Sequence, residues 1–367
     1  MSTLPSQDPF YDAVPAPPEP GVPVRFRRVD VPTGVHASAW QLVHGSTGSR
    51  GPTAVSGTVL VPDEPWAAGG PRPVLSYGVG VHGLDRDAAP SRLLVEGTEP
   101  ELPLVSAALE QGWAVAVTDG EGLGMPGPHT YGAGRPGGHT MLDVVRASQV
   151  VAADVTPDSP CVLWGYSEGG RNAAWAAELH PSYAPELPLV AVAAGGVPAD
   201  LYETAKAIDA GPYSGLGFAV LVGLAHAYDD PDLWSILSFD GYRAARRAAS
   251  LDVVGLVVEH PQPMRAHTRR DEPWDDEAWR AVLAAERNGE RAPQVPTYLY
   301  HVTEDDLVPA RLGRELALQY RSHGADVTWV EVDATDHLSG GHVAAPAALD
   351  WLAARLDAAQ PAAWSRT

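Results

Sequence analysis

The sequence predicts an α/β protein with a mostly parallel central sheet that helices cover on both faces. Two observations predict this fold class: short apolar runs without alternation recur from residue 73 onward, and helical patterns separate most of them. Such runs suit strands that are buried on both faces, and their alternation with helices is typical of parallel sheets. The 367 residues allow either one large domain with an insertion or two ordinary domains.

The first elements along the chain predict an antiparallel start to this sheet. Residues 1–22 are polar and rich in proline, so we expect an extended arm there. The glycine-rich stretch 45–51 joins two strand-like runs, as a hairpin turn would. The three runs in this part of the chain are 24–31, 38–43 and 54–61.

From residue 73 the runs are shorter and mostly apolar without alternation, and we expect them to form the parallel part of the sheet. The expected strands are 74–77, 114–118, 162–165, 189–194, 297–302 and 327–332. The expected helices are 103–111, 139–153, 169–179, 310–323 and 343–356.

One connection is much longer than the others. Residues 199–292 lie between two consecutive expected strands, which is too long for an ordinary connection. The stretches 218–227 and 233–249 within it are apolar or amphipathic. We therefore expect residues 199–292 to form an inserted helical cap on a core made of residues 23–198 and 293–367.

The composition argues against a nucleic-acid partner and against a metal site built from cysteines. The formal net charge is −21, from 25 Lys and Arg against 46 Asp and Glu, whereas nucleic-acid binding needs clustered cations. The compact basic stretch 25–28 is short and is interpreted as a strand edge. The single cysteine, Cys161, lies in an apolar run, so we expect an inert buried thiol and no internal disulfide.

The ends and the apolar segments predict where the protein resides. Residues 1–20 show no cationic start and no apolar run, so no signal peptide is visible. The longest apolar segment, 218–227, is far too short to span a membrane. We therefore expect a cytoplasmic protein without a stable membrane anchor, or a secreted one if the chain is a truncated mature form. The sequence does not indicate an oligomeric state.

Ser167 is the candidate nucleophile. It stands in the string GYSEGG at residues 165–170, between the expected strand 162–165 and an expected helix. A nucleophile elbow needs a strand that ends before the serine, a helix that starts just after it, and small neighbours that permit a strained turn. The string alone is weak in a chain with 37 glycines, so the claim depends on a base and an acid elsewhere.

The candidate acid lies in the loop that follows strand 297–302. In the sequence HVTEDDLVPA, Glu304, Asp305 and Asp306 compete for this role. Asp305 is favoured because its spacing from His301 and from the following Val-Pro pair matches the acid loops of hydrolases. Asp306 is the runner-up.

The candidate base lies in DATDHLSGGH, after strand 327–332. His337 is closer to the strand end than His342, and Asp336 is interpreted as a solvated loop charge. Serine, acid and histidine then follow in the chain order of α/β-hydrolases. The sequence therefore predicts an α/β-hydrolase fold with an inserted helical cap and the triad Ser167, Asp305 and His337.

Dispersed motifs in the same order make the chain similar to the secretory lipase family, which comprises fungal lipase A-like α/β-hydrolases and actinobacterial relatives. The motifs are DPFY, AVSGTVLVP, VLSYGVGVHGLDRDAAPS, GWAVAVTDGEGLG, GYSEGG, SYAPELPLV and HVTEDDLVP. The resemblance implies a Ser-His-Asp esterase or lipase with a cap before the acid loop. Where many exported members carry Cys-Ala-Pro-Ser, this chain has Ala88 in place of that cysteine. A secreted, disulfide-braced enzyme is therefore not expected.

The loop 78–83 is the candidate for the second half of an oxyanion hole. One donor should be the backbone N–H of Glu168, the residue after the nucleophile. We expect the second from His82, which stands where fungal members have Asp; either its imidazole or its backbone could donate. The loop also matches the dinucleotide fingerprint, as does 122–127, but neither opens a helix, so no nucleotide site is predicted.

The leading functional hypothesis is a serine carboxylic-ester hydrolase that acts on small or medium hydrophobic esters through an acyl-enzyme. The 13 histidines show no arrangement suited to a metal, so no metal and no cofactor are expected. Two alternatives to this hypothesis stay open. In the first, the same triad transfers the acyl group to another nucleophile, as an acyltransferase would, or acts as a thioesterase or peptidase. In the second, the chain is a hydrolase fold that binds a ligand without catalysis.

Overall fold

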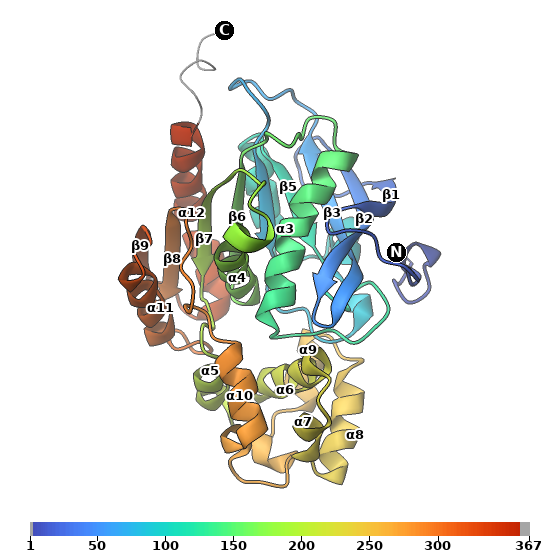
Figure 1. Cartoon of the computed structure of the whole chain (residues 1–367), viewed down its shortest axis with the longest axis vertical. Coiled ribbons are helices and arrows are strands. Elements are labelled where there is room, and N and C mark those ends of the chain that lie inside the picture. Colours follow the sequence, from blue (N-terminus) through green and yellow to red (C-terminus); the bar gives the residue numbers. More distant parts are fainter. Residues whose placement is uncertain (1–2, 360–367) are drawn as a thin grey trace.

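The computed structural model describes residues 3–359 and shows a sheet flanked by helices, with a further group of helices at one end (Figure 1). Within these residues, nine strands form one sheet in the order β1-β2-β3-β5-β4-β6-β7-β8-β9. They are β1 (Pro23–Val29), β2 (Ala37–Gly48), β3 (Gly51–Pro62), β4 (Val74–Gly78), β5 (Ala114–Thr118), β6 (Cys161–Tyr166), β7 (Leu189–Gly195), β8 (Thr297–Val302) and β9 (Val327–Val332). Residues 1–2 of the predicted arm and 360–367 of the predicted core lie outside the described residues.

The pairing changes from antiparallel to parallel along the sheet. Strands β1, β2 and β3 pair antiparallel, and β3 pairs antiparallel with β5. Every pairing from β5 through β4, β6, β7 and β8 to β9 is parallel. The predicted fold class is confirmed, because the parallel strands follow the apolar runs seen in the sequence and all but the edge strand β9 are largely buried.

Two buried hydrophobic clusters lie on opposite faces of the sheet. Along β6, Cys161 and Leu163 point into the first cluster, and Val162 and Trp164 point into the second. The first cluster is completed by α3 (Gly134–Val151), α4 (Glu168–Tyr183) and α11 (Ala310–Ser322). The second is completed by α1 (Pro90–Glu96), α2 (Leu102–Glu110) and α12 (His337–Ala359). Cys161 is buried, as predicted.

Two helices begin earlier than the sequence predicted, because distant residues cap them. Helix α12 starts at His337 rather than 343, and its first N–H donates to Asp306, a residue of the β8 loop. Helix α3 starts at Gly134 rather than 139, and the Gly134 N–H donates to the carboxylate of Glu286 at 2.7 Å. Local patterns could not show either start, because the acceptors lie far away in the sequence.

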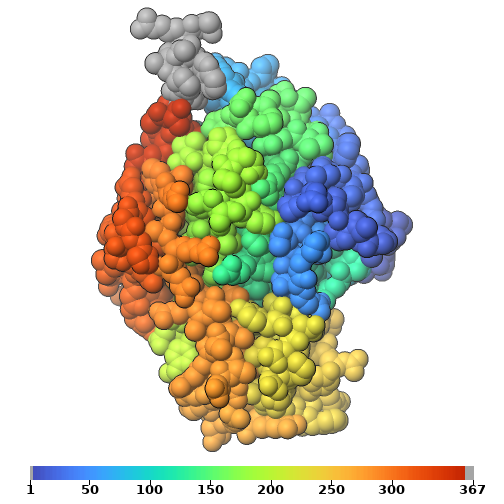
Figure 2. Space-filling model, viewed as in Figure 1, coloured from blue at the N-terminus to red at the C-terminus, as the bar shows by residue number. Residues whose placement is uncertain are grey.

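The connection between β7 and β8 is helical and lies beyond the carboxyl ends of the parallel strands (Figure 1). It contains α5 (Leu201–Ile208), α6 (Ser214–Tyr228), α7 (Pro231–Ser235), α8 (Phe239–Ala248), α9 (Val253–Glu259) and α10 (Glu277–Ala285). Most of α6 is buried, and the other helices pack around it in a separate hydrophobic cluster. Figure 2 shows these residues as a lobe against the rest of the molecule. Arg171 of α4 is ion-paired with Glu286 beside this lobe, at 3.1 Å.

Candidate active site

Ser167 lies in a strained turn between β6 and α4. Its φ of 57° and ψ of −120° are unfavourable for a residue with a side chain, and strain of this kind gathers at functional sites. The turn needs glycine neighbours: a Cβ on Gly169 would come within 1.9 Å of the carbonyl oxygen of Gly78. These features are those of a nucleophile elbow, which presents the serine hydroxyl above the end of the strand.

Ser167, His337 and Asp305 form a continuous hydrogen-bonded chain. The Ser167 Oγ lies 2.8 Å from His337 Nε2, and His337 Nδ1 lies 2.7 Å from Asp305 Oδ2. The loops after β6, β8 and β9 bring these residues together at the carboxyl edge of the sheet, although 170 positions separate the serine from the histidine. A carboxylate on Nδ1 fixes the ring in the tautomer whose Nε2 accepts the serine proton.

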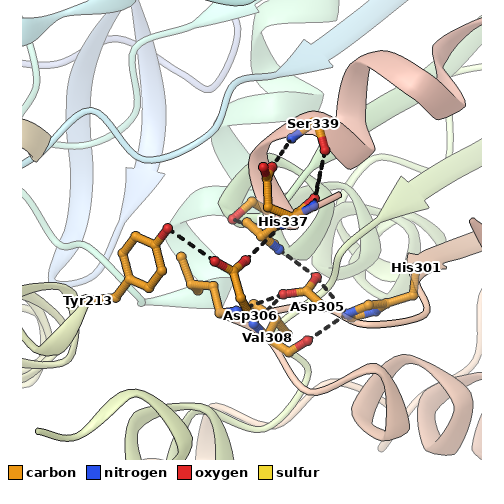
Figure 3. Close-up of polar contacts among 10 residues, drawn as sticks. Tyr213, His301, Asp305, Asp306, Val308, His337 and Ser339 are labelled. Carbon is orange, nitrogen blue, oxygen red and sulfur yellow. Dashed lines mark hydrogen bonds and ion pairs between the residues drawn. The ribbon is translucent and has the colours of Figure 1, made fainter. Parts of the chain in front are cut away.

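Asp305 is held as a carboxylate by its own loop (Figure 3). The backbone N–H groups of Leu307 and Val308 donate to Asp305 Oδ1 at 2.9 and 2.7 Å. Burial raises the pKa of Asp305, but His301 and His337 beside Oδ2 outweigh it and hold this pKa well below its usual value. The charge of Asp305 therefore persists at neutral pH and orients His337.

The competing acidic residues have other partners. Asp306 Oδ1 accepts the backbone N–H of His337 at 2.9 Å, and its Oδ2 lies 3.3 Å from the hydroxyl of Tyr213 (Figure 3). Asp336 accepts the N–H of Ser339 in the first turn of α12. Glu304 is exposed. His342 lines the cleft beside His337 but is not part of the hydrogen-bonded chain.

The two residues predicted to supply oxyanion donors, Glu168 and His82, differ in how their polar groups are occupied. The N–H of Glu168 opens α4 and has no partner inside the helix. The imidazole of His82 is committed elsewhere: Nδ1 lies 2.7 Å from the Gly80 carbonyl oxygen, and Nε2 lies 2.7 Å from Glu99 Oε2. Within the described residues neither backbone N–H has an acceptor. Of the two groups of His82 that the sequence left open, the backbone N–H is therefore the one without a partner in the described part of the chain.

A cleft of about 650 Å³ opens beside the three residues. Ser167 and His337 lie on its wall, next to the loop 80–82. Most of its remaining lining is apolar and comes largely from α2, α6, α9, α12 and the loop after β8: Leu104, Leu216, Val253, Val254, Val257, Val258, Leu338 and Leu307. A narrow apolar pocket of about 40 Å³ reaches Ser167 from the helical lobe, between Leu201, Ile208 and Val220.

Among the described residues, no group of three or more His, Cys, Asp and Glu side chains could hold a metal ion. None of the helices in residues 3–359 is long and apolar enough to cross a membrane.

Sequence reasoning missed the polar residues that support the site. Glu99, Glu101 and Tyr77 hold the loop 78–83, and His301 contacts the acid. Glu99 and Glu101 stand in an ordinary loop before α2, where no motif distinguishes them. Their role is visible only in space, because they are 17 and 21 positions away from the residues that they contact.

The carboxyl of Glu168 makes stability depend on pH. Burial raises the pKa of Glu168 to about 8, against a usual 4.5, although His82 and Arg171 nearby lower it in part. A raised carboxyl pKa costs stability progressively between those two pH values. Glu168→Gln is therefore expected to raise the free energy of unfolding by about 1–2 kcal/mol near pH 8.5 and by less than about 0.5 kcal/mol near pH 4.5. Urea denaturation at both pH values measures this.

The exposed Glu110→Gln is the control for this change and should have the same small effect at both pH values. An equal gain for Glu168→Gln at the two pH values would contradict the assignment.

The chain is similar to known lipases over nearly its whole length. The family model described as secretory lipase matches residues 88–363. A probable inactive lipase of Mycobacterium tuberculosis is 31% identical over 96% of this chain and 82% of its own length. Lipase A of Arthroderma benhamiae is 30% identical over 96% of this chain and 80% of its own length.

Among solved structures, lipase A of Candida antarctica in its closed state superposes with a TM-score of 0.86 at 23% identity. The similarity covers 98% of this chain and 88% of that one. This confirms the predicted α/β-hydrolase fold, and the family model confirms the resemblance seen in the sequence motifs.

The cytoplasmic location predicted from the sequence is wrong. The matching family is one of secretory lipases, which points to an extracellular enzyme. The prediction depended on the polar residues 1–20, and a segment that lacks the pattern of an export signal does not determine where a protein acts.

Proposed function

The chain belongs to the secretory lipase family of ester hydrolases, and we propose that it cleaves hydrophobic carboxylic esters through an acyl-enzyme on Ser167. One observation carries this proposal. The Oγ of Ser167 is 2.8 Å from His337 Nε2, whose Nδ1 is 2.7 Å from the Asp305 carboxylate. A serine hydroxyl is a poor nucleophile until a base removes its proton, and this arrangement places that base in contact.

In the acylation step, Ser167 Oγ attacks the carbonyl carbon and its proton passes to His337 Nε2. The carbonyl oxygen becomes an oxyanion, which the backbone N–H groups of Glu168 and His82 stabilise. When the tetrahedral intermediate collapses, the bond to the alcohol oxygen breaks and His337 returns the proton to the departing alcohol. Asp305 stays ionised throughout and stabilises the imidazolium.

In the deacylation step, a water molecule replaces the alcohol. His337 takes one proton from this water as its oxygen attacks the acyl carbon. Collapse of the second intermediate returns the proton to Ser167 Oγ and releases the carboxylic acid. The products are therefore one alcohol and one acid, and the enzyme is regenerated.

The lining of the cleft favours an apolar acyl chain. Val253, Val257 and Leu216 face the catalytic residues from the helical lobe, while Leu104 and Leu338 face them from the core. We propose that residues 199–292 act as a cap, because α6 and α9 close one side of this cleft. The volume of about 650 Å³ fits small or medium hydrophobic esters.

A panel of p-nitrophenyl esters with graded acyl length tests this function. Each methylene group buried in the cleft contributes about 0.8 kcal/mol, so kcat/KM should rise about four-fold per added CH₂ until the chain fills the cleft. Initial rates from acetate to laurate measure this dependence. A flat or falling series over the short acids would contradict an apolar acyl site.

Acyl transfer is the second candidate, because the same acyl-enzyme could react with an alcohol or amine in place of water. Product analysis with an added primary alcohol distinguishes the two. We expect the free acid as the main product at low alcohol concentration; if the transferred ester dominates there, the chain is a transferase.

A further inference from the structure

We propose that Glu99 is a positioning residue that keeps His82 doubly protonated and fixes the oxyanion loop, residues 78–83. The inference rests on the proposed function, since it concerns the loop that would hold the oxyanion. The imidazole of His82 is nearly buried between the loop and Glu99.

The hydrogen bonds of His82 require two ring protons. Its Nδ1 faces the Gly80 carbonyl oxygen and its Nε2 faces Glu99 Oε2, each at 2.7 Å. A backbone carbonyl can only accept, and an ionised carboxylate can only accept, so both ring nitrogens must donate. A neutral imidazole has a single donor and would leave one of these short contacts without a proton. In the alternative arrangement the proton is on Glu99 and His82 is neutral, and the number of ring protons on His82 distinguishes the two.

Carboxylates on the segment before α2 hold the loop in place. Glu101 accepts the Gly80 N–H at 2.8 Å and the hydroxyl of Tyr77, while Glu99 Oε1 accepts the Glu101 N–H at 3.1 Å. The Gly80 N–H is thereby occupied, whereas that of His82 stays available to a substrate. The loop thus receives its geometry from Glu99 and Glu101 before any substrate binds.

Backbone hydrogen bonds from the helical lobe also hold the loop 78–83. The His82 carbonyl oxygen accepts the N–H of Val253, and the Leu84 N–H donates to Leu251 at 2.9 Å. Gly83 has a φ of 107°, and a Cβ there would lie 2.5 Å from the backbone of Asp252. The segment on either side of the His82 N–H is therefore held, by the His82 side chain toward the core and by the His82 carbonyl oxygen toward the helical lobe.

The surroundings of His82 are consistent with a charged ring. The facing groups are Glu99 and Glu101 from the segment before α2, Asp119 and His129 from the loop after β5, and Glu168 from α4. Burial lowers the pKa of His82, but the Glu99 charge and hydrogen bond outweigh it and raise this pKa to about 9. The ring therefore keeps its second proton below that pH and adds positive charge beside the developing oxyanion.

Glu99→Gln tests the assignment, because glutamine keeps the shape and an acceptor but removes the charge. We expect kcat to fall about 10- to 100-fold with KM changed less than about two-fold, since the loss falls on transition-state binding. The alkaline limb of the kcat profile, near pH 9 in the wild type, should move down by about one unit or more. Glu99→Asp should recover part of kcat, and the exposed Glu110→Gln should match the wild type.

A spectroscopic measurement determines the protonation of His82 without relying on enzyme activity. In ¹⁵N-histidine-labelled wild-type enzyme at pH 7, His82 should show two protonated ring nitrogens, assigned by their loss in His82→Asn. A single ring proton on His82 in the wild type would overturn the inference, and so would an unchanged kcat and pH profile in Glu99→Gln. If that variant does not fold, the wild-type spectrum alone decides the protonation of His82.

Fluorophosphonate labelling distinguishes failure of this inference from failure of the proposed function. A wild-type enzyme that is not labelled refutes the proposed function. A labelled wild-type enzyme, together with a Glu99→Gln variant of unchanged kinetics, refutes only this inference.

Discussion

Ser167→Ala is expected to lower kcat for ester hydrolysis by about 10⁵- to 10⁶-fold, the largest effect of any single change in this chain. The reason is chemical: alanine cannot form the acyl-enzyme, and the remaining rate comes only from the oxyanion donors and substrate binding. Initial rates with a short p-nitrophenyl ester measure the loss. Labelling by a fluorophosphonate probe should disappear in parallel, because the probe reacts with an activated serine.

Alanine at position 167 should not unfold the protein, since the change removes the hydrogen bond of the serine hydroxyl to His337 and the strained turn is set by its glycine neighbours. Ser322→Ala provides the matched control, because Ser322 lies exposed on α11, where its hydroxyl bonds only to the Gln319 carbonyl oxygen. The control should label and turn over like the wild type. Equal labelling of wild type and Ser167→Ala would refute a nucleophilic Ser167.

The comparison of wild type with Ser167→Ala also tests whether this chain is a hydrolase fold without catalytic activity. The M. tuberculosis relative, at 31% identity, carries the description probable inactive lipase. This chain retains the contacts that an active serine needs, with Ser167, His337 and Asp305 joined at 2.8 and 2.7 Å. Measurable turnover that depends on Ser167 would exclude the inactive reading for this chain.

The strands and the order of the catalytic candidates could be predicted because both leave local signals. Strands leave a local pattern whether they pair parallel or antiparallel, and all nine runs correspond to strands of the structure. Ser167, Asp305 and His337 each stand just after such a run, and parallel strands bring their carboxyl ends to one edge. Because all three residues follow parallel strands, the sequence alone predicted that they lie near one another at this edge of the sheet.

What could not be predicted depends on contacts between distant segments. The starts of α3 and α12 are set by Glu286 and Asp306, and the ring of His82 is bound by Glu99. Nothing in the residues around His82 indicates that partner. The choice between Asp305 and Asp306 was likewise made on spacing alone, and both turn out to contact His337, one at the ring and one at the backbone.

Asp305→Asn and Asp306→Asn therefore form a matched pair that should differ by orders of magnitude. At position 305, an amide in place of the carboxylate removes the charge that stabilises the imidazolium and can present its NH₂ to Nδ1, which favours the wrong tautomer. We expect kcat to fall about 10³- to 10⁴-fold. At position 306, the Asn Oδ1 still accepts the His337 N–H, so kcat should fall less than about ten-fold.

Both variants keep the size of the side chain, so thermal unfolding should show folded proteins whose rates can be compared directly. Kinetics with one ester at a fixed pH measure the two losses. Equal losses would mean that the two carboxylates share the role of the acid, and a larger loss for Asp306→Asn would transfer that role to Asp306. The geometry opposes both outcomes: Asp305 Oδ2 is the oxygen in contact with the ring nitrogen, whereas Asp306 Oδ1 is bound to the backbone N–H of His337. A carboxylate can set the tautomer only through the ring, and Asp305 is the acid bonded to it.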